Sequence, residues 1–328
     1  IKDDLYDPSY SDLIRVAFTT EFNRGKIQDL VSLLSGRNFE TREYEQSIAD
    51  DTFQRLEKSI FKFINKINFE RLVMIIKSAG FIDTDFITSK NALNSAYIVY
   101  LKLKDQGYNP NQIETYVRKW FVLAYLTSRY SGSPESQFDE DIRAISKMDF
   151  GEFLRMNEES QLSEGFWNSQ LIQELNKSTV NNPFINTFFA SQIKAKDLGF
   201  LSADITVETL LQHRGDVHHI FPKNYLRKKY ASKADYNQIA NYAYMQSEIN
   251  IKIADEAPKV YFAKIIDDIR SGNNKLTGLE SEEQLFENLK MHCIPQEVIN
   301  WEIENYQDFL ELRRGLIADK IKNYYQKL

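Results

Sequence analysis

The chain contains four histidines, and two of them, His218 and His219, are adjacent in the short apolar segment from Asp216 to Pro222. Successive side chains of an extended segment point to opposite faces, so one imidazole could bind a cation while the other stays free as a base. Asn250 follows in the same region and would supply an oxygen ligand. A base beside a bound cation could take a proton from a reacting group while the cation neutralises negative charge.

The spacing around this pair resembles the HNH, or ββα-metal, nuclease motif, in which a metal ligand and a general-base His precede a hydrophobic pair and Pro. Two Asn residues follow at the matching distance: Asn241 and Asn250 are nine residues apart, and Pro258 lies eight beyond Asn250. The wider frame, with residues 129–136 before the motif and a Tyr-rich terminal helix after it, resembles the C-terminal part of GmrSD-type modification-dependent restriction endonucleases. This resemblance is strongest over 200–265 and looser before residue 130.

The resemblance implies a role for each matching residue. His219 corresponds to the general base, and Asn241 to the Asn that fixes the neighbouring loop through backbone hydrogen bonds; both are therefore assigned to catalysis. His218 and Asn250 correspond to the ligands of one divalent metal ion, Mg²⁺ or Mn²⁺. Many HNH domains have Asp where this chain has His218, and because imidazole suits softer ions, Zn²⁺ and Ni²⁺ are the alternatives.

A basic stretch directly follows the motif. Between Phe221 and Lys233 there is no acidic residue, and the expected phosphate contacts there are Lys223, Arg227, Lys228 and Lys229. A solvated helix face explains the same charges equally well. Lys252, two residues after Asn250, is the candidate for contact with the scissile phosphate. The whole chain has a net charge of −6, which argues against a protein that coats nucleic acid without specificity.

The remaining candidate ligands have simpler interpretations. Asp216 could contact His218, but it follows Gly215, and a turn is favoured. His213 falls at the end of a helix expected over 204–214, where its charge suits the helix dipole. His292 stands beside Cys293, and one Cys with one His is not a zinc site, so packing is the expected role of this pair.

The hydrophobic periodicity predicts a mainly α protein. Two short strands, 217–221 and 242–245, are expected to pair antiparallel and to precede a helix over 248–253, which would form the ββα unit. Helices are expected over 51–66, 91–104, 110–129, 204–214, 260–269 and 302–327, with another that opens at Ser133. The aromatic stripe of the last helix is expected in the core rather than against DNA.

The loop 130–132 is the expected domain seam. It would separate a helical domain, 1–131, from an α-rich nuclease domain, 132–328, whose motif occupies 216–258. GmrSD proteins usually carry an N-terminal ParB-like domain, which senses modified DNA, uses nucleotide and bears an Asp-Gly-Gln-Gln-Arg-like motif. This sequence has no such motif and begins at Ile1 rather than Met, so we expect a longer protein with that sensor domain as partner, and 1–131 as the end of its sensing or linker region.

The composition is that of an intracellular protein. A single Cys excludes a disulfide framework, and the longest apolar run, 120–126, is too short to cross a bilayer, so a cytoplasmic location without membrane contact is expected. The expected function is metal-dependent cleavage of DNA, restricting modified or phage DNA in prokaryotic defence. The alternatives are a catalytically degenerate DNA- or protein-binding module of the same family, and a helical protein in which the His pair is incidental.

Overall fold

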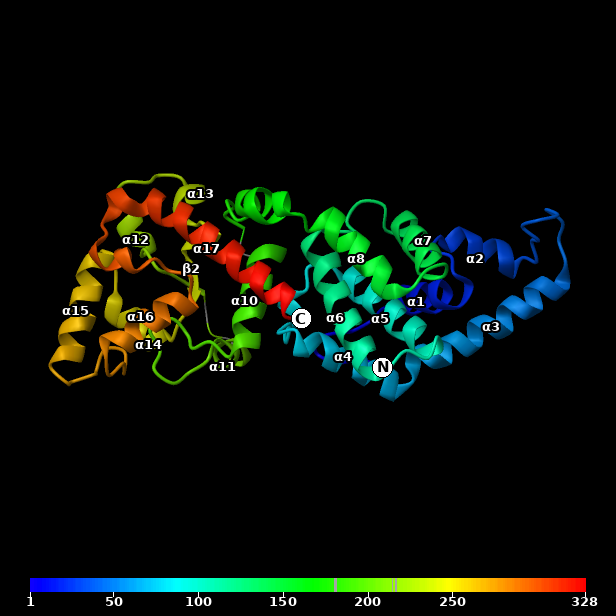
Figure 1. The fold of residues 1–328 in the computed structure, drawn as a ribbon, viewed down its shortest axis with the longest axis horizontal. Coiled ribbons are helices and arrows are strands. Elements are labelled where there is room, and N and C mark those ends of the chain that lie inside the picture. Colours follow the sequence, from blue (N-terminus) through cyan, green and yellow to red (C-terminus); the bar gives the residue numbers. More distant parts are fainter. Residues whose placement is uncertain (180–181, 214, 216) are drawn as a thin grey trace. The chain divides into compact units, whose positions relative to one another are not determined.

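The computed structural model describes residues 1–179, 182–213, 215 and 217–328 (Figure 1). Within these residues the protein is mainly α, with seventeen α-helices and one two-stranded hairpin. The chain divides into two compact units, 1–163 and 164–327. The mainly α prediction is confirmed at this level.

The first unit is entirely helical in its regular structure. Its elements are α1 (Tyr10–Phe22), α2 (Ile27–Leu34), α3 (Gln46–Ile64), α4 (Lys66–Ser78), η1 (Thr84–Phe86), α5 (Lys90–Asp105), α6 (Pro110–Leu126), α7 (Pro134–Ile145) and α8 (Phe150–Gln161). α5 is almost completely buried and packs against both α1 and α6. Asn109 caps α6 ahead of Pro110, and Gly107 adopts a φ of 77° after α5, which are the start and stop signals that the sequence predicted.

The compact unit extends past the loop 130–132 that the sequence indicated as a seam. Asp141 of α7 accepts hydrogen bonds from Arg129 Nε at 2.9 Å and from Tyr130 Oη at 2.7 Å, and these groups are buried. A charge-assisted pair of this kind fastens α7 to the end of α6. The boundary between the compact units therefore lies at Ser163 and Glu164.

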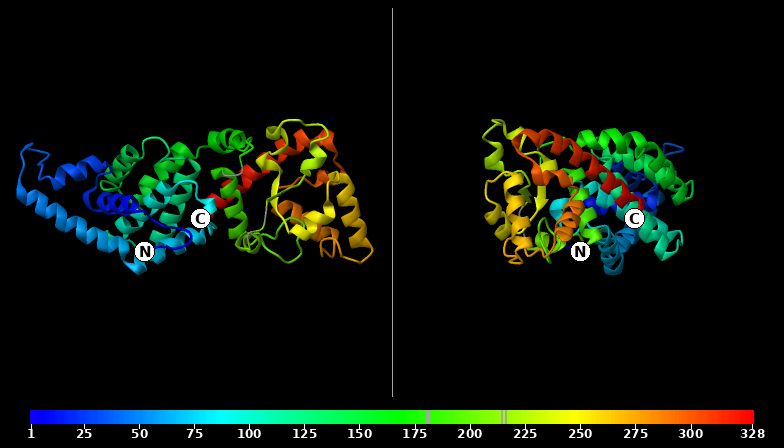
Figure 2. Two further views of the ribbon diagram at one scale, coloured as in Figure 1. Left: turned by 180° about the vertical axis from the view of Figure 1, so that it is seen from behind. Right: turned by 60° about the vertical axis from the view of Figure 1, so that its left-hand side comes forward.

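The second unit surrounds the hairpin with helices (Figures 1 and 2). Its elements before the second strand are η2 (Phe166–Gln170), α9 (Leu171–Glu174), α10 (Pro183–Ala195), α11 (Val207–Gln212), β1 (Val217–His219), α12 (Lys223–Leu226), α13 (Lys233–Tyr236) and η3 (Ile239–Asn241). Those that follow are β2 (Tyr242–Tyr244), α14 (Ser247–Ile253), α15 (Pro258–Arg270), α16 (Glu282–Met291), η4 (Gln296–Asn300), η5 (Ile303–Asn305) and α17 (Tyr306–Gln326). The predicted order of strand, strand and helix is confirmed.

The core of this unit joins the hairpin to the helices on either side of it. Ile220 and Phe221, directly after β1, belong to a buried cluster with residues of α14 to α17. β1 is two residues shorter than predicted, because these two side chains enter the core instead of continuing the strand. The aromatic stripe of α17 is also core, as expected: Tyr306 and Phe309 are both buried, and their rings contact Phe221.

α17 lies against α10 and brings one buried cation to the hairpin (Figure 2). Arg313 is fully buried, and Nη1 donates to the carbonyl of Ala240 at 2.6 Å while Nε donates to the carbonyl of His292 at 3.1 Å. Burial lowers the pKa of Arg313 to about 10, so the guanidinium remains charged at neutral pH. The residue before Asn241 is thus fixed by a helix that follows it by more than sixty positions.

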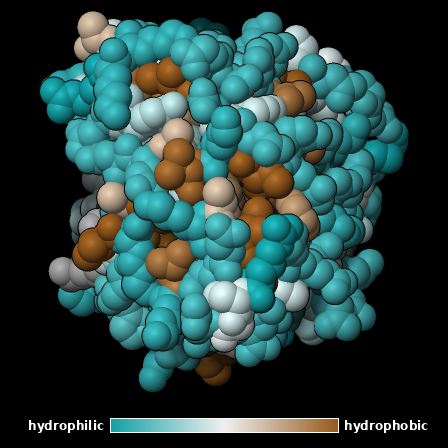
Figure 3. All heavy atoms as spheres, turned by 90° about the vertical axis from the view of Figure 1, so that its left-hand side faces the viewer, coloured by the Kyte–Doolittle hydropathy of each residue, from teal (hydrophilic) through white to brown (hydrophobic). Residues whose placement is uncertain are grey.

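Among the helices of the described residues, none has both the length and the apolar composition needed to span a membrane. The face drawn in Figure 3 is mainly hydrophilic, with its hydrophobic residues in separate small areas. Single apolar residues scattered over a surface are ordinary for folded proteins.

Candidate functional site

The two adjacent histidines lie on the first strand of the hairpin. β1 and β2 pair antiparallel, with His218 opposite Ala243 and His219 opposite Tyr242. Because neighbouring residues of a strand point to opposite faces, the two imidazoles face different surroundings, as the sequence predicted. The ring of His219 meets the ring of Tyr242 edge-on, with 4.9 Å between centroids.

Asn241 holds the chain where it leaves β1. Its side chain is fully buried; Oδ1 accepts from the backbone N–H of Phe221 at 2.8 Å, and Nδ2 donates to the carbonyl of Phe221 at 3.0 Å. The carbonyl of Asn241 also accepts from Ile220 N at 2.9 Å. These are backbone hydrogen bonds of the kind expected for Asn241, while its part in catalysis stays a prediction.

A second contact on the same segment was not predicted. Tyr261 of α15, fully buried, donates its hydroxyl hydrogen to the carbonyl of Ile220 at 3.0 Å. Burial raises the pKa of Tyr261 well above its ordinary value, so the hydroxyl remains a donor. No local motif marks Tyr261, because its position is defined only once α15 packs on the hairpin.

His219 has one hydrogen-bond partner among the described side chains. Its Nε2 lies 3.1 Å from Oδ1 of Asn237, a residue that sequence reasoning missed. With this amide oxygen as acceptor, Nε2 carries the hydrogen and Nδ1 keeps its lone pair. The signal that could have identified Asn237 is a third Asn in the same loop, four residues before Asn241.

The surroundings of His219 keep its imidazole neutral at pH 7. Burial lowers the pKa of His219 below its ordinary value of 6.5. The hydrogen bond with Asn237 opposes this shift, while electrostatic interactions with Lys223 and His218 add to it. A neutral imidazole can accept a proton, and a positioned group of this kind is the usual general base.

The candidate metal ligands are few. His218 is on β1, and Asn250 is half-buried on α14, which follows β2 after two residues. Within the described part of the chain no group of three or more His, Cys, Asp or Glu side chains surrounds a common point, and Asp216, with the alternative roles considered for it, lies outside that part. A divalent ion held by His218 and Asn250 stays a prediction, in which water and phosphate would complete the coordination.

The basic residues after the motif are exposed and only weakly engaged. α12 is a single helical turn, so the four basic residues Lys223, Arg227, Lys228 and Lys229 do not lie along one face of a long helix. Lys228 lies 5.4 Å from the ring centroid of Tyr225, and Lys229 is 3.8 Å from Glu304. Lys223 is near enough to His219 to lower its pKa, and Arg227 has no ion pair among the described residues.

Lys252 is differently placed from the other four. Its ammonium donates to the carbonyl of Lys275 at 2.6 Å and to that of Leu276 at 3.3 Å, so it ties α14 to the loop after α15. A structural role of this kind competes with the predicted phosphate contact, because both use the same ammonium hydrogens.

The other two histidines have the structural roles expected of them. His213 is exposed at the end of α11, with Nδ1 2.9 Å from the carbonyl of Thr209. His292 is fully buried, with Nε2 2.8 Å from the carbonyl of Leu198 and Nδ1 3.2 Å from Gln192 Nε2, and burial lowers its pKa to about 3. Burial also raises the pKa of Cys293 to about 11, so this thiol is un-ionised at pH 7.

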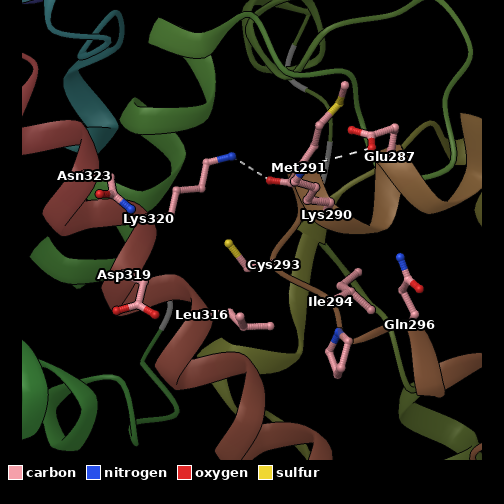
Figure 4. Close-up of a pocket in the computed structure, with 11 residues that line it drawn as sticks. Glu287, Lys290, Met291, Cys293, Ile294, Gln296, Leu316, Asp319, Lys320 and Asn323 are labelled. Carbon is pink, nitrogen blue, oxygen red and sulfur yellow. Dashed lines mark hydrogen bonds and ion pairs between the residues drawn. The ribbon is translucent and has the colours of Figure 1, made fainter.

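A groove in the second unit is separate from the motif. It has a volume of about 560 Å³ and is lined by residues of α16, α17 and the chain between α16 and η4, among them Cys293 and Leu316 (Figure 4). None of the motif residues lines it. The candidate site on the hairpin is therefore separate from this groove.

Comparison with known proteins finds a distant relative. An uncharacterised protein of Methanocaldococcus jannaschii, MJ0686, is 28% identical over an alignment of 222 positions, which covers 62% of this chain and 36% of the relative. The chain therefore spans about a third of the length of that protein. No family model matches the chain, and no solved structure matches it.

Proposed function

We propose that this protein is a metal-dependent DNA endonuclease of the HNH, ββα-metal, type, and that it restricts modified or phage DNA in prokaryotic defence. The observation that carries the proposal is His219: a neutral imidazole on a short hairpin, with Nε2 hydrogen-bonded to Asn237 and the following segment fastened by Asn241. The resemblance to GmrSD proteins supports a sensor domain as the partner that selects the DNA, and this chain covers 36% of the length of its relative.

The chemistry assigns His219 to proton transfer. Nδ1 accepts a proton from a water, the water oxygen forms a bond to phosphorus, and the bond from phosphorus to the 3′ oxygen breaks, with that oxygen protonated by solvent. Asn241 keeps the segment after His219 in place throughout. A divalent ion at His218 and Asn250, Mg²⁺ or Mn²⁺ with Zn²⁺ or Ni²⁺ as alternatives, supplies charge neutralisation on the phosphate when bound.

Positive charge beside the base would hold the substrate. Lys223 is the basic residue whose charge reaches His219, and Arg227, Lys228 and Lys229 extend the exposed positive charge beyond it. Contacts of this sort position a phosphodiester backbone without reading its sequence. An acidic chain can thus bind DNA over a short basic stretch.

The decisive experiment is cleavage of supercoiled plasmid with Mn²⁺ or Mg²⁺ by the wild-type protein, His219→Ala and His213→Ala. His213 is the matched control because it is an exposed His outside the motif. His219→Ala should lower the rate by about 10²- to 10⁴-fold, the usual contribution of a general base, while His213→Ala cleaves like wild type. Circular dichroism and melting of each variant establish that it is folded.

Two other outcomes overturn the proposal in different ways. If the wild-type protein binds DNA but does not cleave it with either metal, the protein is instead a catalytically degenerate binding module of the same family. Equal cleavage by His219→Ala and wild type would place the chemistry elsewhere in the chain.

A further inference from the structure

Asn237 is placed by contacts that reach its loop from the segment after α9 and from α17. The loop lies between α13 and η3, and its backbone is fixed by hydrogen bonds from Ile239 N to the carbonyl of Lys177 at 2.9 Å and from Asn241 N to the carbonyl of Gln238 at 2.8 Å. The buried guanidinium of Arg313 holds the carbonyl of Ala240. A side chain on a backbone restrained in this way has a defined direction.

The side chain of Asn237 is directed at His219 and, among the described residues, at no other side chain. Oδ1 is 3.1 Å from Nε2 of His219, and the two residues are eighteen positions apart. The neighbouring amide, Gln238, is used differently: its Nε2 donates to the carbonyl of Ala234 at 2.7 Å, and its Oε1 accepts from Arg314 at 3.3 Å. Adjacent amides on one loop therefore serve packing in one case and the His ring in the other.

The consequence for the imidazole is a choice between its two neutral forms. A neutral imidazole has one N–H, and the Oδ1 acceptor favours the form with hydrogen on Nε2, which leaves the Nδ1 lone pair available. The T-shaped contact with the Tyr242 ring also limits rotation of the His219 ring. Without the acceptor, both forms and more than one ring orientation become accessible.

We infer that Asn237 is a positioning residue that holds His219 with hydrogen on Nε2 and with Nδ1 free to accept a proton from water. The inference rests on the proposed nuclease function. It adds to that function a residue that touches neither DNA nor metal and that acts through the ring of His219.

The test compares Asn237→Leu, Asn237→Asp and Gln238→Leu in the full chain. Leu has a similar size to Asn but no acceptor, Asp keeps the acceptor oxygen, and Gln238→Leu removes the neighbouring amide as a matched control. Single-turnover cleavage at saturating plasmid should fall by about 10- to 100-fold in Asn237→Leu, the usual cost of a misplaced catalytic group. Asn237→Asp should recover most of the rate, and Gln238→Leu should retain it, with DNA affinity unchanged in all three.

A readout independent of activity is the ¹⁵N spectrum of the His219 ring at a pH where the ring is neutral. Wild type and Asn237→Asp should show hydrogen on Nε2, and Asn237→Leu should show a mixture of both neutral forms. An unchanged spectrum and rate in Asn237→Leu would refute the positioning role while the nuclease function stands. A changed spectrum in a protein that never cleaves DNA would overturn the proposed function and the catalytic part of this inference, leaving only the hydrogen bond.

Discussion

Asn241→Ala removes the two hydrogen bonds that fasten the segment after His219. Both partner groups, the N–H and the carbonyl of Phe221, belong to a buried residue, so the substitution leaves a buried donor and a buried acceptor unpaired. Each such group costs about 1–3 kcal/mol, so the free energy of unfolding should fall by about 2–6 kcal/mol, with part of the upper range lost if water enters the cavity. We expect the hairpin to be destabilised most, because β1 has only three residues.

The assay is equilibrium unfolding in urea, with Asn273→Ala as control. Asn273 is an exposed Asn whose amide bonds only Ser271, and its replacement should change the free energy of unfolding by less than about 0.5 kcal/mol. Equal stability of the two variants would show that Asn241 does not hold the segment. A folded Asn241→Ala protein that cleaves DNA at the wild-type rate would show that His219 does not depend on it.

Three further predictions follow from the site and its surroundings. Because the folded pKa of His292 is about 3 against 6.5 ordinarily, the unfolded chain binds a proton that the folded chain does not, and the free energy of unfolding should fall by about 2 kcal/mol between about pH 7.5 and pH 5; His292→Gln should lose this part of the slope, and an equal slope would contradict it. Mn²⁺ should raise the melting temperature, less so in His218→Ala and Asn250→Ala, with activity partly restored by excess metal and abolished by chelation; an unchanged shift in both variants would move the metal elsewhere. Replacing Arg227 and Lys228 by Gln should weaken DNA binding and reduce the slope of log affinity against log salt by roughly 0.9 per lost phosphate contact, with cleavage at saturating DNA little changed; an unaltered slope would leave the two residues as solvated charges.

The parts of the fold that could be predicted are those that local patterns encode. The hairpin and α14 were expected from the resemblance of the motif to the ββα unit, and the start of α6 from Asn109 and Pro110. Helix ends were less accurate: the helix predicted over 204–214 is α11, which begins only at Val207, after Thr206 caps it. A helix begins at a capping residue, but where several polar residues lie close together the sequence does not show which of them is the cap.

The parts that escaped prediction depend on residues far apart in the sequence. Asn237 reaches His219 across eighteen positions, Tyr261 reaches Ile220 across forty-one, and Arg313 reaches Ala240 across seventy-three. None of these pairs leaves a periodic or spaced signal, because each exists only after the helices have packed. The motif thus predicted the residues that could do chemistry, while the residues that orient them came from the tertiary structure.

The hairpin cannot by itself keep His219 in place. Two paired strands of three residues each have too little buried surface to be stable alone in water. Its geometry is maintained by Tyr261 from α15 and by Arg313 from α17. Within the described residues the guanidinium of Arg313 donates hydrogen bonds to two backbone carbonyls. Burying this charge is costly, so Arg313 needs both carbonyls as acceptors, and the rings of Phe188 and Phe309 also face its guanidinium, with centroids at 5.9 and 6.0 Å. The C-terminal helix is therefore part of what positions the candidate base, and residues 217–253 would not preserve this site if separated from it.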